Sequence, residues 1–116
     1  MKYLSITLII FAFIFSCKNN EKLAPYLESS NSDSLIIGYN NVKYGDTQFI
    51  KKIFDSAYDG RETFILDYKG QTVYQAKMNA IQRISGIKPP KKITYKPDTT
   101  IVEFYRNWAK EKGYID

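Results

Sequence analysis

The chain has 116 residues and a net charge of +5, with one cysteine and no histidine. This length accommodates one domain, and the 44% hydrophobic content is too high for an intrinsically disordered chain. The absence of histidine excludes His-based catalysis and His-containing zinc sites, and a single cysteine excludes an intramolecular disulfide. Without a glycine-rich phosphate loop either, the sequence predicts a protein that uses no cofactor and no metal.

Residues 1–16 have the composition of an export signal. Lys2 supplies the positive charge, and an almost unbroken apolar run over residues 4–15 follows it. This run is too short to span a bilayer, which requires about 20 apolar residues. We therefore predict a signal peptide over residues 1–16, with an uncleaved N-terminal anchor as the alternative.

The only cysteine lies at the end of this apolar run. The sequence Ile14-Phe15-Ser16-Cys17 resembles the lipobox of bacterial lipoproteins, in which the cysteine is acylated and the chain is cut just before it. The resemblance implies that Cys17 is lipidated and that the protein is held on the exported side of a bacterial cell membrane or outer membrane. It also implies that Cys17 provides the contact with the membrane.

The polar, serine-rich sequence after Cys17 is predicted to be a flexible tether that completes the segment 17–34. The folded domain is then expected over residues 35–116. At its start, residues 35–37 fit either a short strand or the last part of a helix that ends near Gly38.

The first predicted helix of the domain begins after Asp46, its expected N-cap, and ends at Asp59-Gly60. Its apolar residues recur with helical spacing: Phe49, Ile50, Ile53, Phe54, Ala57 and Tyr58. The stretch 64–68 that follows is ambiguous, because Lys69-Gly70 could form a two-residue β-hairpin turn with 71–75 as the return strand.

Thr72 and Gln75 have the spacing of a capping box, which argues against that return strand and predicts a second helix from Thr72 to Gly86. Its expected buried stripe is Val73, Ala76, Ala80, Ile81 and Ile84.

A third helix is predicted to begin at the capping box Thr100-x-x-Glu103, with Asp98 as the rival N-cap, and to end at Gly113. Its expected apolar face is Ile101, Phe104, Tyr105 and Trp108. We expect Trp108 to be buried against the end of the second helix, at Ile81 and Ile84.

One pattern of residues runs through the second and third predicted helices. It consists of Tyr68-x-Gly70-x-Thr72-Val73, Ala76, Ala80, Ile81, Ile84-Ser85-Gly86, a proline-containing loop, Asp98 and Phe104-x-x-x-Trp108. This pattern resembles the last unit of bacterial HEAT-like helical repeat proteins, over about seventy residues from 44 to 113. The chain offers at most two such units, where stacked arrays use three or more. The resemblance implies a small all-α, HEAT-like domain of three to four helices that acts as a binding or scaffolding module.

The sequence between Asp67 and Asp98 contains no acidic residue. It contains seven basic ones: Lys69, Lys77, Arg83, Lys88, Lys91, Lys92 and Lys96. The densest part is the loop that carries Lys88, Lys91, Lys92, Tyr95 and Lys96. A basic loop stiffened by Pro89-Pro90 suits an anionic partner, and its alternative role is to keep the protein soluble.

The carboxylates give little indication of catalysis. Asp55 and Asp59 are four residues apart with Glu62 nearby, but capping and solvation explain them at least as well as a general acid–base pair. Ser56 and Ser85 have no candidate base. We therefore expect no enzymatic activity.

Together these features predict a lipid-anchored envelope protein that is a non-enzymatic binding or scaffolding module. Its expected partner is an envelope protein or an anionic polymer, and export argues against nucleic acid. The alternative is an inhibitor or immunity-type module that blocks a partner enzyme.

Overall fold

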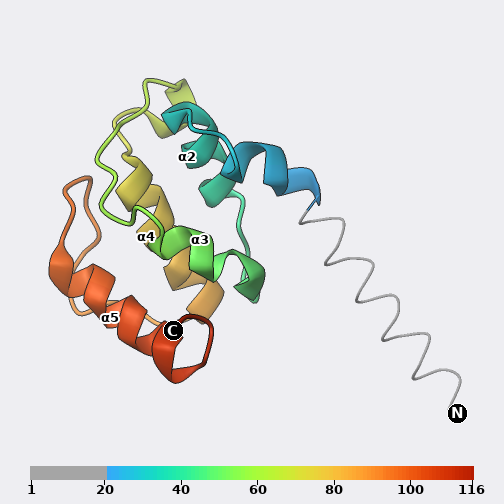
Figure 1. Cartoon of the computed structure of the whole chain (residues 1–116). Helices are drawn as coiled ribbons and strands as arrows, with labels where there is room; N and C mark the ends of the chain where they lie inside the picture. The colour runs from blue at the N-terminus through green and yellow to red at the C-terminus, as the bar shows by residue number, and fades with distance from the viewer. Residues whose placement is uncertain (1–20) are drawn as a thin grey trace, which may run out of the picture.

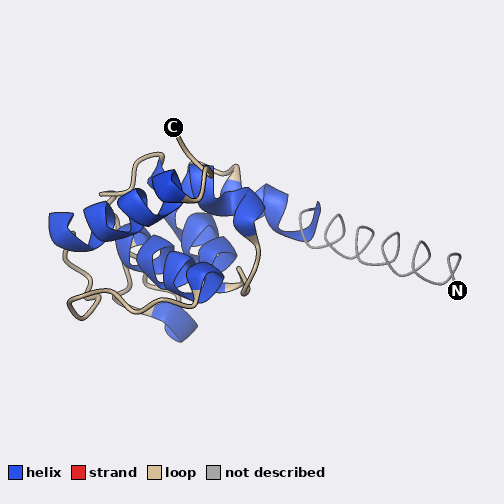
Figure 2. Cartoon of the chain, turned by 90° about the horizontal axis from the view of Figure 1, so that it is seen from below, coloured by secondary structure: helices blue, strands red, loops and turns tan. Residues whose placement is uncertain are grey.

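The computed structural model describes residues 21–116, so the predicted signal peptide and Cys17 lie outside the described residues. Within this range the chain consists of helices and loops, without a strand (Figure 2). The helical segments are residues 21–27, α2 (Ser32–Asn40), the 3₁₀ turn η1 (Thr47–Phe49), α3 (Ile50–Phe54), the 3₁₀ turn η2 (Leu66–Tyr68), α4 (Val73–Ser85) and α5 (Thr99–Glu111). The all-α prediction is confirmed.

Helix α4 lies at the centre of the domain, with α2 on one side, α5 on the other and α3 alongside (Figure 1). It begins and ends as predicted. The Thr72 hydroxyl accepts a hydrogen bond from the Gln75 N–H at 3.1 Å, and Gly86 ends the helix in the left-handed conformation with φ +70°. Local capping chemistry alone therefore sets both ends of this helix.

Helix α5 begins at Thr99, two residues earlier than an N-cap at Thr100 would place its start. Asp98, the rival candidate, is the N-cap, and its carboxylate accepts a hydrogen bond from the Thr100 N–H at 2.8 Å. The buried face is also rotated from the predicted one. Its buried residues are Ile101, Val102, Tyr105 and Ala109.

Trp108 is half-buried rather than buried, so that prediction is wrong. It lies at the edge of the core, and its ring centroid is 5.6 Å from that of Tyr114 in the C-terminal segment. The small side chain of Ala109 occupies the buried position instead, which allows α5 to approach the core closely.

The predicted helix after Asp46 is shorter than expected. It consists of η1 and the five-residue α3, because Ser56 takes a left-handed conformation with φ +58° and turns the chain. The carboxylate of Asp46 accepts a hydrogen bond from the Lys43 N–H at 2.8 Å in the preceding turn.

The hairpin that was the alternative interpretation of residues 64–75 does not form, and a closed loop takes its place. Its closing contacts are backbone hydrogen bonds of 3.0 Å between Thr63 and each of Gln71 and Gly70, and Glu62 and Thr72 form an isolated antiparallel bridge. Thr63 is fully buried, and its hydroxyl donates to the Asp33 carboxylate at 2.5 Å. The return strand cannot form because its residues begin α4.

The predicted tether and the domain boundary at Leu35 need correction. Residues 21–27 are helical, and Leu23 and Leu27 are 3% and 4% exposed in the core. Asn31 then caps α2, accepting a hydrogen bond from the Asp33 N–H at 2.8 Å. The folded domain therefore extends at least to residue 21, and residues 35–37 belong to a helix, not a strand.

Gly38 explains why residues 21–27 can lie so close to α2. A methyl group at this position would come within 2.7 Å of the Leu27 Cδ2 atom and 2.8 Å of the Tyr26 Cβ atom. Only a glycine leaves room for this contact.

The core is formed by apolar residues from every helix. Its fully buried side chains include Ile36, Tyr39, Ile50, Ile53, Val73, Tyr74, Met78, Ile81, Ile101, Val102 and Tyr105. No helix within residues 21–116 has the length and apolar character needed to cross a membrane.

Candidate functional site

The predicted basic loop connects α4 to α5 and is fastened to the domain at several points. Near its start, the Tyr105 hydroxyl donates a hydrogen bond to the Ile87 carbonyl at 2.7 Å. Further along, the Thr72 hydroxyl donates to the Tyr95 carbonyl at 2.9 Å, and Ile93 packs against the core. The loop is therefore held in a defined position over the flank of α4.

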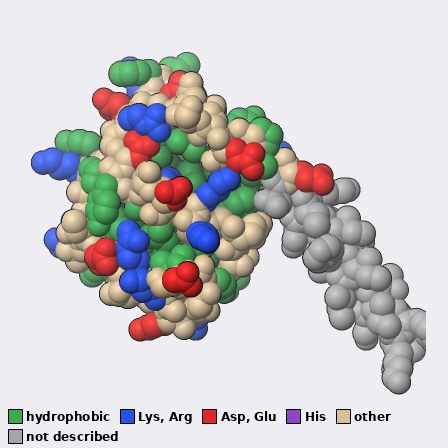
Figure 3. Space-filling view, in the orientation of Figure 1, with side chains coloured by type: hydrophobic (Ala, Val, Ile, Leu, Met, Phe, Trp, Pro, Cys, Tyr) green, Lys and Arg blue, Asp and Glu red, His purple; other side chains and the backbone are tan. Residues whose placement is uncertain are grey.

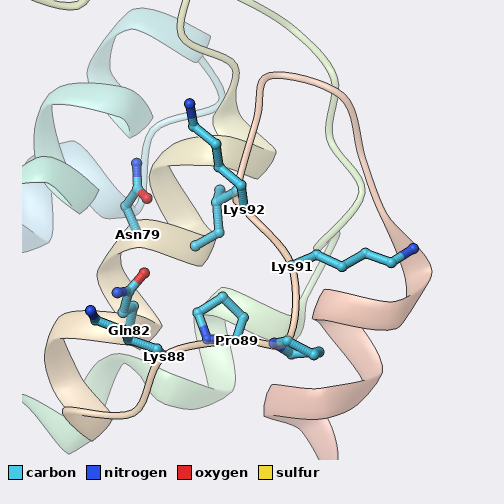
Figure 4. Close-up of a pocket in the computed structure, with 8 residues that line it drawn as sticks. Asn79, Gln82, Lys88, Pro89, Lys91 and Lys92 are labelled. Atoms are coloured by element: carbon cyan, nitrogen blue, oxygen red, sulfur yellow. The ribbon is translucent and has the colours of Figure 1, made fainter.

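A hollow of about 430 Å³ lies between this loop and α4. Asn79 and Gln82, one helical turn apart on α4, form one side. The loop segment from Lys88 to Ile93 forms the other (Figure 4). This volume falls within the range of small-molecule sites in proteins.

The two amides in this hollow have unused hydrogen-bonding capacity. Asn79 and Gln82 are half-buried, and neither side-chain amide is hydrogen-bonded to another residue within 21–116. Each amide group offers a carbonyl acceptor and two N–H donors. The hollow thus presents both donors and acceptors to whatever enters it.

The loop lysines fall into two groups. Lys91 extends away from the hollow toward α5, where its Nζ lies 3.6 Å from the Asp98 carboxylate (Figure 4). Lys88 and Lys92 border the hollow, and neither belongs to an ion pair among the described residues. Two uncompensated cations therefore lie beside the two free amides.

The charge of Lys91 also acts on its partner. Although desolvation opposes the shift, the hydrogen bond from the Thr100 N–H and the charge of Lys91 keep the pKa of the Asp98 carboxyl below its usual value. Lys91 also borders the hollow, but its ammonium group pairs with the N-cap residue of α5.

Tyr95 and Lys96 are not brought together with Lys88 and Lys92 in this hollow. Tyr95 is 61% exposed and lines a different depression, together with Leu66 and Tyr68 of the loop before α4. Of the predicted contact residues, only Lys88, Lys91 and Lys92 border the hollow.

Asn79 and Gln82 were missed by sequence reasoning. Their i, i+3 spacing on α4 was a signal that they share a helix face, but nothing in the sequence indicated that the loop returns over that face.

Seven basic residues between Asp67 and Asp98 were expected on the surface. Two of them point into the domain instead. Lys77 is 4% exposed, and its ammonium group donates to the backbone carbonyls of Asp55 at 2.5 Å and Ser56 at 3.3 Å. Desolvation lowers the pKa of Lys77, and the negative charges of Asp59 and Asp55 oppose that shift. Lys77 thus closes the C-terminal end of α3.

Arg83 binds backbone carbonyls at the C-terminal end of α2. Its guanidinium donates to the Val42 carbonyl at 2.9 Å and to the Tyr39 carbonyl at 2.5 Å, just beyond and within the last turn of that helix. Helix carbonyl ends carry partial negative charge, so both cations are well placed. Helix α4 therefore holds two neighbouring helices by their C-terminal ends.

The carboxylates considered as a catalytic group are engaged in local structure. Asp59 receives hydrogen bonds from the Arg61 side chain, the shortest at 2.7 Å, and these bonds lower the pKa of Asp59. Asp59, Asp55 and Lys77 also line a second hollow of about 420 Å³ whose charged groups have both signs. The Arg61 contact therefore favours the ionised form of Asp59.

Basic and acidic side chains are interspersed over the face seen in Figure 3, without a large area of one sign. Within residues 21–116 no group of His, Cys, Asp or Glu side chains could hold a metal ion. The hollow beside Lys88 and Lys92 is therefore the strongest candidate site.

Comparisons with protein-family models, with curated proteins and with solved structures find no match to this chain. The likeness to lipoproteins and to HEAT-like repeats stays a prediction.

Proposed function

We propose that this protein is a lipid-anchored, exported binding module that holds an anionic partner of the cell envelope at the loop between α4 and α5, without catalysing a reaction. The observation that carries the proposal is the position of Lys88 and Lys92. Both border a hollow that also contains two amides without protein partners, and neither lysine has a counter-ion among the described residues. Cations left uncompensated beside free polar groups favour an anionic ligand.

Several basic residues already have partners within the domain, which reduces the number available to an external ligand. Lys77 and Arg83 bind carbonyls inside the fold, and Lys91 pairs with Asp98. Of the seven basic residues between Asp67 and Asp98, those that remain for an external partner are Lys69, Lys88, Lys92 and Lys96. A surface of this kind supplies binding rather than catalysis.

A non-catalytic role is also supported by the state of Asp59, one of the carboxylates considered for catalysis. A general acid needs a raised pKa, whereas the pKa of Asp59 is lowered by Arg61. The lipid anchor itself is supported by the lipobox resemblance at Cys17 alone.

The test is binding of the detergent-purified full chain to anionic vesicles and to polygalacturonate at increasing salt. Each lysine near an anionic surface contributes about 1 kcal/mol, and the Debye length falls from about 10 Å at 0.1 M salt to about 3 Å at 1 M. We expect salt-sensitive binding that is lost when Lys88, Lys91, Lys92 and Lys96 are all changed to Gln. Absence of salt-sensitive binding in the wild type would overturn the proposal.

The anchor has a separate test. Cys17→Ser should abolish incorporation of labelled fatty acid and release the protein from the membrane fraction, because no other cysteine is present. A variant that still fractionates with membranes and migrates like the wild type would contradict the lipid anchor.

A further inference from the structure

Resting on the proposed function, we infer that the hollow between α4 and the basic loop is a site for one acidic sugar unit of an anionic polysaccharide. The unit's carboxylate or phosphate would lie between Lys88 and Lys92, and its hydroxyls would bind the amides of Asn79 and Gln82.

The first argument is the mixture of polar groups. A simple anion uses only the N–H donors of an amide and leaves its carbonyl oxygen without a partner. Sugar hydroxyls both donate and accept hydrogen bonds, so they match the amides of Asn79 and Gln82. Lys88 and Lys92 then provide the charge for the acidic group.

The second argument is the shape of the site. The hollow has a volume of about 430 Å³ and is open to solvent. Pro89, Pro90 and Ile93 give it an apolar border beside the polar groups, which suits the C–H face of a sugar ring. A site open in this way admits an internal unit of a chain that continues in both directions.

The third argument is rigidity. The Tyr105 hydroxyl holds the Ile87 carbonyl, and Thr72 holds the Tyr95 carbonyl, so both ends of the loop are fixed before a ligand arrives. A site that is already ordered loses little conformational entropy on binding.

Lys91 supplies a matched control for this inference. It is adjacent to Lys92 in sequence, carries the same charge and also borders the hollow, but its side chain extends away to Asp98, so its ammonium group is already paired (Figure 4). If only the overall charge of the loop attracted a ligand, Lys91→Gln and Lys92→Gln would weaken binding equally. If the ligand binds in the hollow, Lys92→Gln should weaken binding more than Lys91→Gln does.

The experiment is a titration of the full chain with fluorescein-labelled trigalacturonate, with neutral trigalactose and anionic phosphatidylglycerol vesicles as parallel probes. We expect the labelled acidic trimer to bind and the neutral trimer not to bind. Lys92→Gln should weaken the affinity for the acidic trimer about fivefold, which corresponds to about 1 kcal/mol. Asn79→Ala should weaken it by a similar factor, and Lys91→Gln by less than twofold. Thermal melts of each variant establish that the fold is retained.

The outcomes separate this inference from the proposed function. If Lys91→Gln and Lys92→Gln weaken binding equally and Asn79→Ala has no effect, the sugar site is overturned while charge-driven binding stands. If vesicles bind and the acidic trimer does not, the sugar is also the wrong ligand, and the anionic partner is a lipid surface. If no anionic probe binds the wild type, both proposals fail.

Discussion

The ammonium group of Lys77 on α4 lies 2.5 Å from the carbonyl oxygen of Asp55, the residue that ends α3. It also lies over the ring of Tyr39, 5.5 Å from the ring centroid. One buried cation thus joins α4 to the end of α3 and to a tyrosine of α2. A helix as short as α3 has little stability of its own, so this contact helps to keep it folded.

Lys77→Met is expected to destabilise the domain by about 1–3 kcal/mol, because the part-buried hydrogen bonds from the ammonium group to the carbonyls of Asp55 and Ser56 are lost. Chemical denaturation of the full chain measures the change. Lys92→Met, at an exposed position, is the control and should change stability by less than about 0.5 kcal/mol. Equal stability of both variants would show that the Lys77 contact contributes nothing.

Gly38→Ala is expected to destabilise the domain by about 1–3 kcal/mol, because the new methyl group would overlap Leu27 and Tyr26. The clash should separate residues 21–27 from α2, and limited proteolysis should then cut this segment first. Gly60→Ala is the control, since a Cβ atom there meets no other atom within 4 Å. Resistance of the Gly38→Ala segment to protease would contradict the packing described here.

The sequence predicted the features that local chemistry determines. Thr72 and Gly86 set the ends of α4 through contacts within a few residues, so both could be read from the sequence. Asp98 and Thr100 were both credible caps for α5, and only the path of the incoming loop decides between them. Features that depend on distant residues could not be predicted in this way.

Lys77 illustrates the limit. It stands four residues after Val73 and four before Ile81, on the buried stripe of α4, so its helical position was a signal that it is buried. The absence of acidic residues between Asp67 and Asp98 instead suggested that Lys77 belongs to a basic surface. The carbonyls that compensate its burial come from another helix, 21 and 22 residues away in sequence.

Residues 21–34 illustrate a second limit. Their polar composition indicated a mobile segment, but two leucines one helical turn apart, Leu23 and Leu27, are sufficient to attach the first part to the core. This contact is possible because Gly38 has no side chain, and the composition of residues 21–34 does not reveal it. For the candidate site, the lysines were predictable, whereas their separation into Lys91 and the pair Lys88 and Lys92 depended on the position of Asp98.

Trp108→Ala is expected to cost less than Tyr105→Ala. Tyr105 is fully buried and bonded to the Ile87 carbonyl, so its removal should cost about 3–5 kcal/mol, whereas Trp108 is half-buried against Tyr114. Denaturant titrations of both variants test this order. In the native wild type, acrylamide should quench the single tryptophan partly, and complete protection from acrylamide would show that Trp108 is buried after all.

Stability is expected to fall above about pH 10. Desolvation raises the pKa of Tyr39, with the charge of Asp55 adding to the shift, and desolvation also raises the pKa of Tyr105. Above the ordinary tyrosine pKa of about 10, the unfolded chain releases these protons and the folded chain keeps them, so unfolding becomes easier. The loss approaches about 1.4 kcal/mol per pH unit for each tyrosine.

Tyr105→Phe should reduce this alkaline loss, and thermal melts from pH 8 to 11 measure it. The lowered pKa of Lys77 has the opposite effect, since stability rises with pH between its folded value and its ordinary value of about 10.5. Because Lys77 is present in both proteins, the difference between wild type and Tyr105→Phe isolates the tyrosine. Identical alkaline profiles would contradict the assignment.

The contact of residues 21–27 with α2 limits how far the domain can travel from its proposed anchor. Only four residue steps separate Cys17 from Glu21, and a fully extended chain covers at most about 14 Å over that length. An acylated Cys17 would therefore confine the domain to a thin layer next to the lipid headgroups. Any ligand in the same layer is met at a high effective concentration, so a shallow site with weak intrinsic affinity is sufficient for lasting association.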